Sequence, residues 1–227
     1  MHPLENVIWH ALTTRQTQFA EGGDGARRFV PEVGPLGAFC EPGPQGYASL
    51  ADVVGTSGSV GLFLDEPYAE RPGWSFVVGA PLLQMICDNG GAKGGGTQAA
   101  EIVELGPQDS PEMIELTTLT KPGPFGPRTH ELGAYVGIRE DGKLVAMAGE
   151  RLKVPGHTEV SAVCTHSEHT GKGYAGILMT EVMRRIRLRG ETPFLHVRGD
   201  NVRAIAIYKR LGFRERKFGH FAVLRKE

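Results

Sequence analysis

The stretch 169-HTGKGYAG-176 decides how the rest of the chain is interpreted, because its glycines stand directly before an apolar helical pattern. Backbone N–H groups in a turn at a helix N-terminus point into one concavity and, together with the helix dipole, favour a phosphate there. The stretch therefore fits a pyrophosphate-binding loop, and a simple turn before the helix is the alternative. The helical pattern that follows places apolar side chains on one stripe, at Ala175, Leu178, Met179, Val182 and Ile186.

Two known loop patterns fit this stretch. Residues 171–176 satisfy the dinucleotide pattern G-x-G-x-x-G, and residues 170–175 fit [QR]-x-x-G-x-[GA], the pyrophosphate pattern of coenzyme A, at all but the first position. In dinucleotide sites the glycines follow a strand almost directly, and an acidic residue about 20 positions later binds the ribose. Here the polar residues 165–170 precede Gly171, and Asp200 comes too late. The context favours coenzyme A.

The remaining elements indicate a mixed α/β fold. After a glycine-rich segment, residues 88–98, the pattern predicts a strand at 100–105, a helix at 110–120, a hairpin at 134–152 and a strand at 158–165. The glycine loop and its helix follow, and then a strand at 193–197, a helix at 200–213 and a strand at 220–226. Residues 4–19 predict a first helix, and the rest of the first third alternates apolar runs with turns.

Residues 158–213 resemble the GNAT superfamily of acetyl-CoA-dependent N-acetyltransferases, and within it the FR47-like group. The strand 159-EVSAVCT-165 and the glycine loop look like motif A of that family, and 195-LHVRGDNVRAIAIYKRLGF-213 looks like motif B. The resemblance covers about residues 99–227. It implies a GNAT acyltransferase fold, with a mixed twisted sheet flanked by helices, and we expect an N-terminal α/β region over residues 1–98 that could be a degenerate GNAT-like copy.

By that resemblance acetyl-CoA is the cosubstrate. The main chain of the strand before the loop would hold the pantetheine arm, the loop would hold the pyrophosphate, and the second helix would contribute Asn201, which is also a plain N-cap candidate. Thr170 stands where the family usually has Arg or Gln, and Lys172 is a candidate to supply the missing charge. The implied cofactor-binding residues are Val163, Cys164, Thr165, Thr170, Gly171, Lys172, Gly173, Tyr174, Ala175, Gly176, Asn201, Ala204 and Tyr208.

The resemblance also implies which groups carry the chemistry. Tyr208 is the expected general acid for the departing thiolate, since a phenol keeps its proton at neutral pH. Glu159, directly or through water, is the expected base for the attacking amine, with Glu150 as the reserve. The predicted activity is acetyl transfer to a primary amine by direct attack. A non-catalytic acyl-CoA sensor that keeps the loop without the chemistry is the alternative.

The acceptor amine is not identified by the sequence. A small molecule, an amino acid and a protein N-terminus all stay open, and Phe125 and Arg128 in the Pro/Gly-rich segment 121–133 are the candidate substrate-binding residues. The formal net charge of −1 provides no field for nucleic acid or an anionic membrane. Cys164, His166 and His169 lie close together, but without a distant fourth ligand they make a poor zinc signature, so no metal is expected.

The cellular compartment is predicted from features that the sequence lacks. Three widely spaced cysteines argue against a disulfide framework and for a reducing compartment. The first residues lack a basic segment leading into an apolar run, and no apolar stretch approaches membrane-spanning length. These features predict a cytoplasmic protein that does not bind a membrane, for which an oligomer is possible. The glycine-rich residues 88–98 are the expected boundary between regions 1–98 and 99–227.

Overall fold

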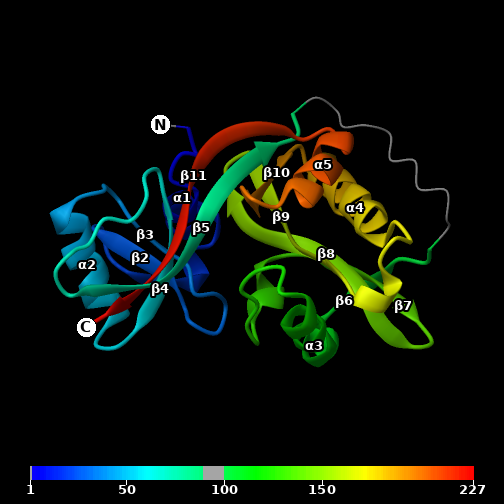
Figure 1. Ribbon diagram of the computed structural model, residues 1–227, viewed down its shortest axis with the longest axis horizontal. Helices are drawn as coiled ribbons and strands as arrows, with labels where there is room; N and C mark the ends of the chain where they lie inside the picture. Colours follow the sequence, from blue (N-terminus) through cyan, green and yellow to red (C-terminus); the bar gives the residue numbers. More distant parts are fainter. Residues whose placement is uncertain (1, 89–99) are drawn as a thin grey trace.

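The computed structural model describes residues 2–88 and 100–227, which form two lobes joined by two long strands (Figure 1). The expected glycine-rich linker, apart from Asp88, lies outside the described residues. The N-terminal lobe contains α1 (Val7–His10), β1 (Ala20–Gly22), β2 (Ala26–Phe29), β3 (Gly37–Phe39), α2 (Pro44–Val54) and β4 (Ser59–Leu64). The strand β5 (Trp74–Ile86) leads out of this lobe.

The second lobe follows the order predicted from the sequence. Its elements are β6 (Val103–Leu105), α3 (Ser110–Thr120), β7 (Tyr135–Glu140), β8 (Lys143–Val154), β9 (His157–Thr165), α4 (Tyr174–Leu188), β10 (Thr192–Arg198), α5 (Val202–Arg210) and β11 (Arg214–Lys226). Asp141 and Gly142 both have positive φ in the turn between β7 and β8, as a tight hairpin requires. Gly190 and Gly212 also have positive φ just after α4 and α5, where a glycine commonly ends a helix.

An eight-stranded sheet runs through both lobes in the order β4-β11-β5-β10-β9-β8-β7-β6. Its pairs are antiparallel except for the parallel pair β9 and β10. The strand β5 therefore lies between β10 and β11, although about half of the chain separates it from them in sequence. The mixed sheet agrees with the predicted fold class, and it includes strands from both sides of residues 88–98.

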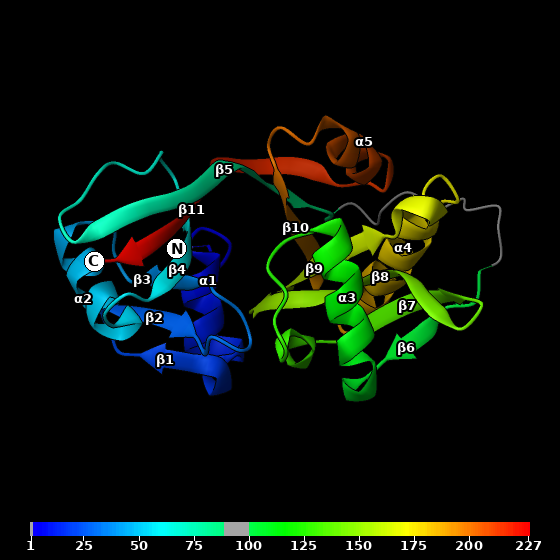
Figure 2. The ribbon, with the colours of Figure 1, turned by 60° about the horizontal axis from the view of Figure 1, so that its bottom comes forward.

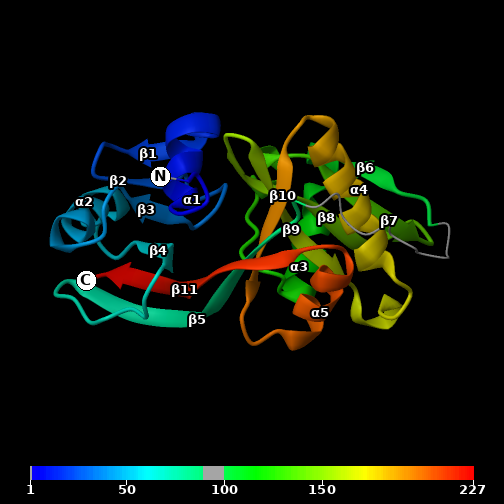
Figure 3. The ribbon, with the colours of Figure 1, turned by 90° about the horizontal axis from the view of Figure 1, so that it is seen from above.

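The strands β5 and β11 form a long ribbon that bridges the lobes (Figures 1 and 3). They pair from Trp74 with Lys226 to Ile86 with Arg214, and only the last part of β5, from Leu82 to Ile86, also pairs with β10. One half of β5 thus belongs to the sheet of the second lobe, while the other half reaches the N-terminal lobe. The lobes are linked by hydrogen-bonded strands rather than by a single chain crossing.

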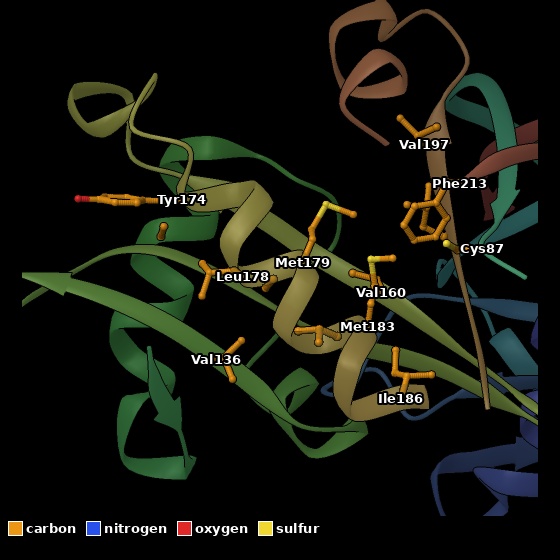
Figure 4. Close-up of a cluster of buried hydrophobic side chains, with 14 of the residues drawn as sticks. Cys87, Val136, Val160, Tyr174, Leu178, Met179, Met183, Ile186, Val197 and Phe213 are labelled. Carbon is orange, nitrogen blue, oxygen red and sulfur yellow. The ribbon is translucent and has the colours of Figure 1, made fainter. Parts of the chain in front are cut away.

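Helices cover the sheet on both faces in the second lobe. The apolar stripe predicted for α4 is buried, with Leu178, Met179 and Ile186 each at 0% exposure against β7, β9 and β10 (Figure 4). On the other face α3 buries Met113 and Leu116 against β8 and β9 (Figure 2). No helix of the described residues combines the length and apolar character that crossing a bilayer requires.

The N-terminal lobe packs its first residues against the middle of the large sheet. The predicted packing face of Leu4, Val7, Ile8, Ala11 and Leu12 is buried beside Leu152 and Phe194. The predicted single helix is shorter than expected, because α1 passes into a π-helical turn at Ala11–Arg15. After that turn the buried amide of Gln16 donates to Arg151 O at 2.7 Å and accepts from Lys153 N at 3.1 Å. These hydrogen bonds satisfy backbone groups of β8 where its register with β9 shifts.

The sheet topology predicts that residues 100–227 do not fold alone. Removing β5 would take Leu83 and Met85 out of the core that they share with α4 and β10, and would leave β10 and β11 without the strand that pairs with both. We expect the isolated fragment to show no cooperative thermal unfolding by circular dichroism. A chain cut by a protease site placed between residues 89 and 99 is the control, and it should stay folded. A sigmoidal transition for the fragment alone would contradict the prediction.

Candidate active site

The strands β9 and β10 separate at the centre of the second lobe. They pair only at Thr192 with His157, Pro193 with Thr158 and Phe194 with Glu159. Beyond the last pair, β10 follows β5 and no pairing of β9 with β10 is found in the described chain. The backbone of β9 from Val160 to Thr165 therefore presents an edge that can pair with an extended ligand, as a sheet edge pairs with a peptide.

A bulge shapes this edge. Ala162 has a φ of +52°, and the register with β8 shifts between Ser161 opposite Gly149 and Cys164 opposite Met147. Positive φ is uncommon for a residue with a Cβ, and strain of this kind persists where the surrounding structure enforces it, often at functional sites. The Thr165 hydroxyl at the end of the edge is buried, and no hydrogen-bond partner for it is found among the described residues. Both features fit an edge built for a ligand.

The glycine loop turns from this edge into α4. Gly171 and Gly173 have φ values of +85° and +82°, and Gly173 is the N-cap of α4, which begins at Tyr174. A Cβ at Gly171, Gly173 or Gly176 would meet nothing within 4 Å, so the space before the loop is open. The first N–H groups of a helix lack intrahelical partners. The loop is shaped to accept a pyrophosphate.

Charged side chains around the loop pair with one another. Lys172 donates to both oxygens of Glu140 at 2.8 Å, Tyr174 also donates to Glu140, and His169 lies 3.1 Å from it. The hydrogen bonds from Lys172 and Tyr174 lower the pKa of Glu140 to about 2. The Thr170 hydroxyl donates to Ser167 O at 2.9 Å. Neither Thr170 nor Lys172 is therefore a free group waiting for phosphate.

The helix α5 carries the expected acid, Tyr208. Tyr208 packs against the core that α4 shares with β9 and β10, and its ring meets Phe213 edge to face at 6.2 Å. Burial raises the pKa of Tyr208 to about 12, so the phenol is protonated at neutral pH. Asn201 caps α5 by accepting from Ala204 N at 3.1 Å. The plain capping role of Asn201 is confirmed.

Glu159, the expected base, is buried in a network of hydrogen bonds. Arg151 donates to both of its oxygens at 2.8 Å, His196 Nδ1 lies 2.7 Å from Oε1, and Leu152 N donates to Oε2 at 3.3 Å. Burial alone would raise the pKa of this carboxyl, but the charge and hydrogen bonds of Arg151, and then the hydrogen bond from His196, lower it to about 2. Glu159 is therefore ionised but weakly basic, and its oxygens are already occupied.

The network continues across the sheet as a polar row. Gln84 Nε2 lies 3.0 Å from His196 Nε2, Arg216 donates to Gln84 Oε1 at 2.8 Å, and Arg216 also donates to Glu5 at 2.6 Å. Because the Gln84 amide donates, His196 Nε2 accepts and its proton sits on Nδ1, facing Glu159. Burial lowers the pKa of His196, which agrees with a neutral ring. Glu150, the reserve base, is also buried and paired, with Arg189 at 2.7 Å and Lys153 at 3.0 Å.

A small pocket lies beside Ala162 on the α3 face of the sheet. The segment 122–125, Tyr135, Arg151 and Ser161 form its walls. Phe125 lines this pocket as the sequence suggests, and its ring meets Tyr135 edge to face at 5.7 Å. Arg128 does not line it, and this exposed side chain pairs with Glu131 at 2.7 Å. Tyr135 and Arg151 were not found by sequence reasoning, because each is an ordinary strand residue whose neighbours only the fold supplies.

One group of potential metal ligands occurs in the described residues. The ligand atoms of His166, Glu168 and His169 lie within 4.8 Å of one another beside the glycine loop. Glu168 is exposed, and His169 already contacts Glu140 and Lys172. Cys164 takes no part in the group, because it is buried on the α3 face and burial raises its pKa to about 11.

The structure fits coenzyme A on three independent observations. The unpaired β9 edge suits an extended pantetheine arm, the open space at the glycine loop suits a pyrophosphate, and the unpartnered Thr165 hydroxyl lies at the junction of the two. Val163, Ala175, Gly176 and Ala204 lie on the elements around this path, and Val163 and Ala204 pack against the shared core. The structure thus brings the expected cofactor-binding residues around one split in the sheet.

Comparisons with known proteins agree with this geometry. The family model described as FR47-like protein matches residues 135–221. A crystal structure of a Novosphingobium aromaticivorans protein assigned to the GNAT family of acetyltransferases is 38% identical, with 100% of both chains covered and a TM-score of 0.88. A search among curated proteins found no match.

More distant structures share the fold. A GCN5-related N-acetyltransferase from Kribbella flavida is 18% identical, with 96% of this chain and 95% of that chain covered and a TM-score of 0.58. A conserved protein of unknown function from Staphylococcus epidermidis is 10% identical, with 96% and 99% covered and a TM-score of 0.59. Both cover nearly the whole chain, so the arrangement of two lobes on one sheet is not peculiar to this protein.

Glu140→Gln should strengthen coenzyme A binding. The substitution removes a negative charge beside the glycine loop and releases Lys172 from its pair. We expect the Kd for coenzyme A, measured by isothermal titration calorimetry at low salt, to fall roughly threefold, with the difference shrinking at high salt. Glu131→Gln, which breaks the exposed pair with Arg128, is the control and should leave the Kd unchanged. An equal or higher Kd for Glu140→Gln would contradict this role of Glu140.

Glu159→Gln should destabilise the fold in a pH-dependent way. At pH 7 it leaves the buried Arg151 charge unpaired, which costs about 3 kcal/mol of unfolding free energy. Because the folded-state pKa of Glu159 is lowered, its stabilisation is complete above the unfolded pKa of 4.5 and is lost as the pH falls toward about 2. Urea unfolding should show the difference from wild type shrinking across that window. A difference that stays constant from pH 7 to pH 3 would show that the carboxylate charge is unimportant.

Proposed function

The chain belongs to the GNAT family of acetyltransferases, and from that premise we propose that it transfers the acetyl group of acetyl-CoA to a primary amine. The observation that carries the proposal is the split between β9 and β10, where the described residues leave an edge of β9 unpaired. Acetyl-CoA supplies the activated acetyl group as a thioester. The residues of the chain bind it, orient it and control one proton.

Binding uses main-chain groups on two elements. We assign the pyrophosphate to the N–H groups from Gly171 to Gly176, where helix α4 begins, and the pantetheine arm to the edge from Val160 to Thr165. Because most of these contacts come from the backbone, the loop can work with Thr170 in place of a charged residue. We also assign the polarisation of the acetyl carbonyl to a backbone N–H of the same edge, at the point where the bulge at Ala162 turns the chain.

Proton control at the sulfur falls to Tyr208. A departing thiolate needs a donor that is protonated at neutral pH, and a phenol with a pKa of about 12 meets that condition. Its position on α5, packed against Phe213 and the core, limits its motion. A protein that only bound acyl-CoA would have little use for a phenol at the sulfur, so this residue favours an enzyme over a sensor.

The amine also has to lose a proton, and Glu159 is poorly suited to take it. Its pKa is about 2, and protonation would break the bidentate pair with Arg151. We propose that Glu159 positions Arg151 and that the amine enters the site already neutral or releases its proton to water. The pH dependence of kcat/KM should then follow the pKa of the amine that is used.

The proposal is tested by following thiol release from acetyl-CoA with a panel of primary amines. Tyr208→Phe keeps the packing of the ring and removes the donor, so we expect kcat to fall 10²- to 10³-fold while the Kd for coenzyme A stays within about twofold. Tyr47→Phe, a buried tyrosine of the N-terminal lobe, is the matched control and should keep full activity.

Two outcomes would count against the enzyme. Tight binding of coenzyme A without turnover on any amine would favour the acyl-CoA sensor. Thermal stabilisation by NAD but not by coenzyme A would overturn the assignment of the glycine loop itself.

A further inference from the structure

The pocket beside Ala162 contains a tyrosine hydroxyl without a partner. Tyr135 is 2% exposed, and its hydroxyl makes no hydrogen bond in the described part of the structure. Its ring is fixed by Phe125 on one side and by Gly149 on the paired strand, where a Cβ would lie 2.2 Å from the ring. A buried hydroxyl without a partner is costly, so a site that retains one is expected to satisfy it with a ligand.

Arg151, which lines the same pocket, has one edge of its guanidinium free within the described residues. Arg151 uses Nε and Nη2 for Glu159, and no hydrogen bond from Nη1 is found within the described residues. Its side chain is 13% exposed, and the residue lines the pocket. The bidentate pair with Glu159 prevents the guanidinium from rotating. The free N–H groups of Nη1 therefore have a fixed direction.

The charge and polarity of the pocket select the kind of group that fits. Arg151 can only donate, and the Tyr135 hydroxyl is free to donate. The nearby carboxylates, Glu159 and Glu150, are buried and already paired with arginine side chains. Arg151 offers a cationic ammonium group no acceptor, whereas a carboxylate would accept from both donors. The remaining walls, which include Pro122, Pro124 and Phe125, suit a short apolar portion of the ligand.

We propose that this pocket binds the carboxylate of an acceptor that carries both a primary amine and a carboxylate, as a free amino acid does. Arg151 Nη1 and the Tyr135 hydroxyl hold the carboxylate, and the amine then faces the acetyl group at the edge of β9 beside Ala162. This inference rests on the proposed acetyl transfer and narrows its acceptor. It makes Tyr135 and Arg151 specificity-determining residues.

The test compares amines that differ only in the carboxylate. Glycine with methylamine, L-alanine with ethylamine, and L-phenylalanine with 2-phenylethylamine form three such pairs, each compared at an equal concentration of neutral amine. We expect kcat/KM from thiol release to favour the amino acid at least tenfold in one or more pairs, because a charge-assisted hydrogen bond is worth about that factor. Equal rates within every pair would overturn the inference.

Variants of Tyr135 and Arg151 test whether the preference for the amino acid arises in the pocket. Tyr135→Phe keeps the ring and removes only the hydroxyl, so KM for the preferred amino acid should rise about tenfold with little change in kcat, while the matching amine is unaffected. Arg151→Lys should raise that KM further, and its thermal unfolding is measured to show that it folds. Tyr47→Phe is the control and should behave as wild type toward both ligands. Equal losses toward the amino acid and the amine would contradict the assignment.

A binding measurement separates this inference from the proposed function. Calorimetric titration of the same pairs into the protein saturated with coenzyme A needs no turnover. Binding of the amino acid but not of the amine, without turnover, would remove the proposed acetyl transfer and leave the carboxylate site standing. Turnover without any preference for the carboxylate would remove the carboxylate site and leave the proposed acetyl transfer standing.

Discussion

The buried pair between Arg151 and Glu159 is the interaction on which the rest of the site depends. Two charges in the interior are tolerated only when each finds enough partners, and here the carboxylate receives two N–H groups from Arg151, one from His196 and one from Leu152. His196 leads on to Gln84 and Arg216, so one polar row crosses β8, β9, β10, β5 and β11. The row ends at Glu5 in the N-terminal lobe and thereby ties the placement of that lobe to the active site.

The split that we assign to the cofactor begins at this row. Glu159 and Phe194 are the last paired residues of β9 and β10, and β10 then turns toward β5. Two strands can separate in the middle of a sheet only if each keeps another partner, and β8 and β5 provide those partners. Because β5 provides one of these partners, the N-terminal region is a structural part of the split. It supplies the strand that holds one side of the split in place.

Patterns among residues close in sequence predicted several elements of the fold and of the site. The glycine loop, the stripe of α4, the hairpin turn at Asp141 and Gly142 and the capping of α5 depend on residues close in sequence, and the structure has each of them. The place of β5 between β10 and β11 was not predicted, because strand pairing over such a separation leaves no mark in a single sequence. The same holds for Tyr135 and Arg151. Their significance lies in a hydroxyl and a guanidinium edge left unpaired, which only the three-dimensional surroundings decide.

The sequence identified Glu159 as chemically important, and the structure changes the chemistry that suits it. A general base must accept a proton in each turnover, yet protonating Glu159 would leave Arg151 charged and unpaired in the interior. Keeping the carboxylate ionised has the opposite effect, since it holds the guanidinium of Arg151, which lines the pocket, in a fixed orientation. A carboxylate that must stay ionised to hold Arg151 is a poor general base, and a pKa near 2 favours the ionised partner of Arg151 over the base. In our proposal the residue contributes to the reaction by fixing the side chain that holds the acceptor, while the proton of the amine is left to the amine and to water.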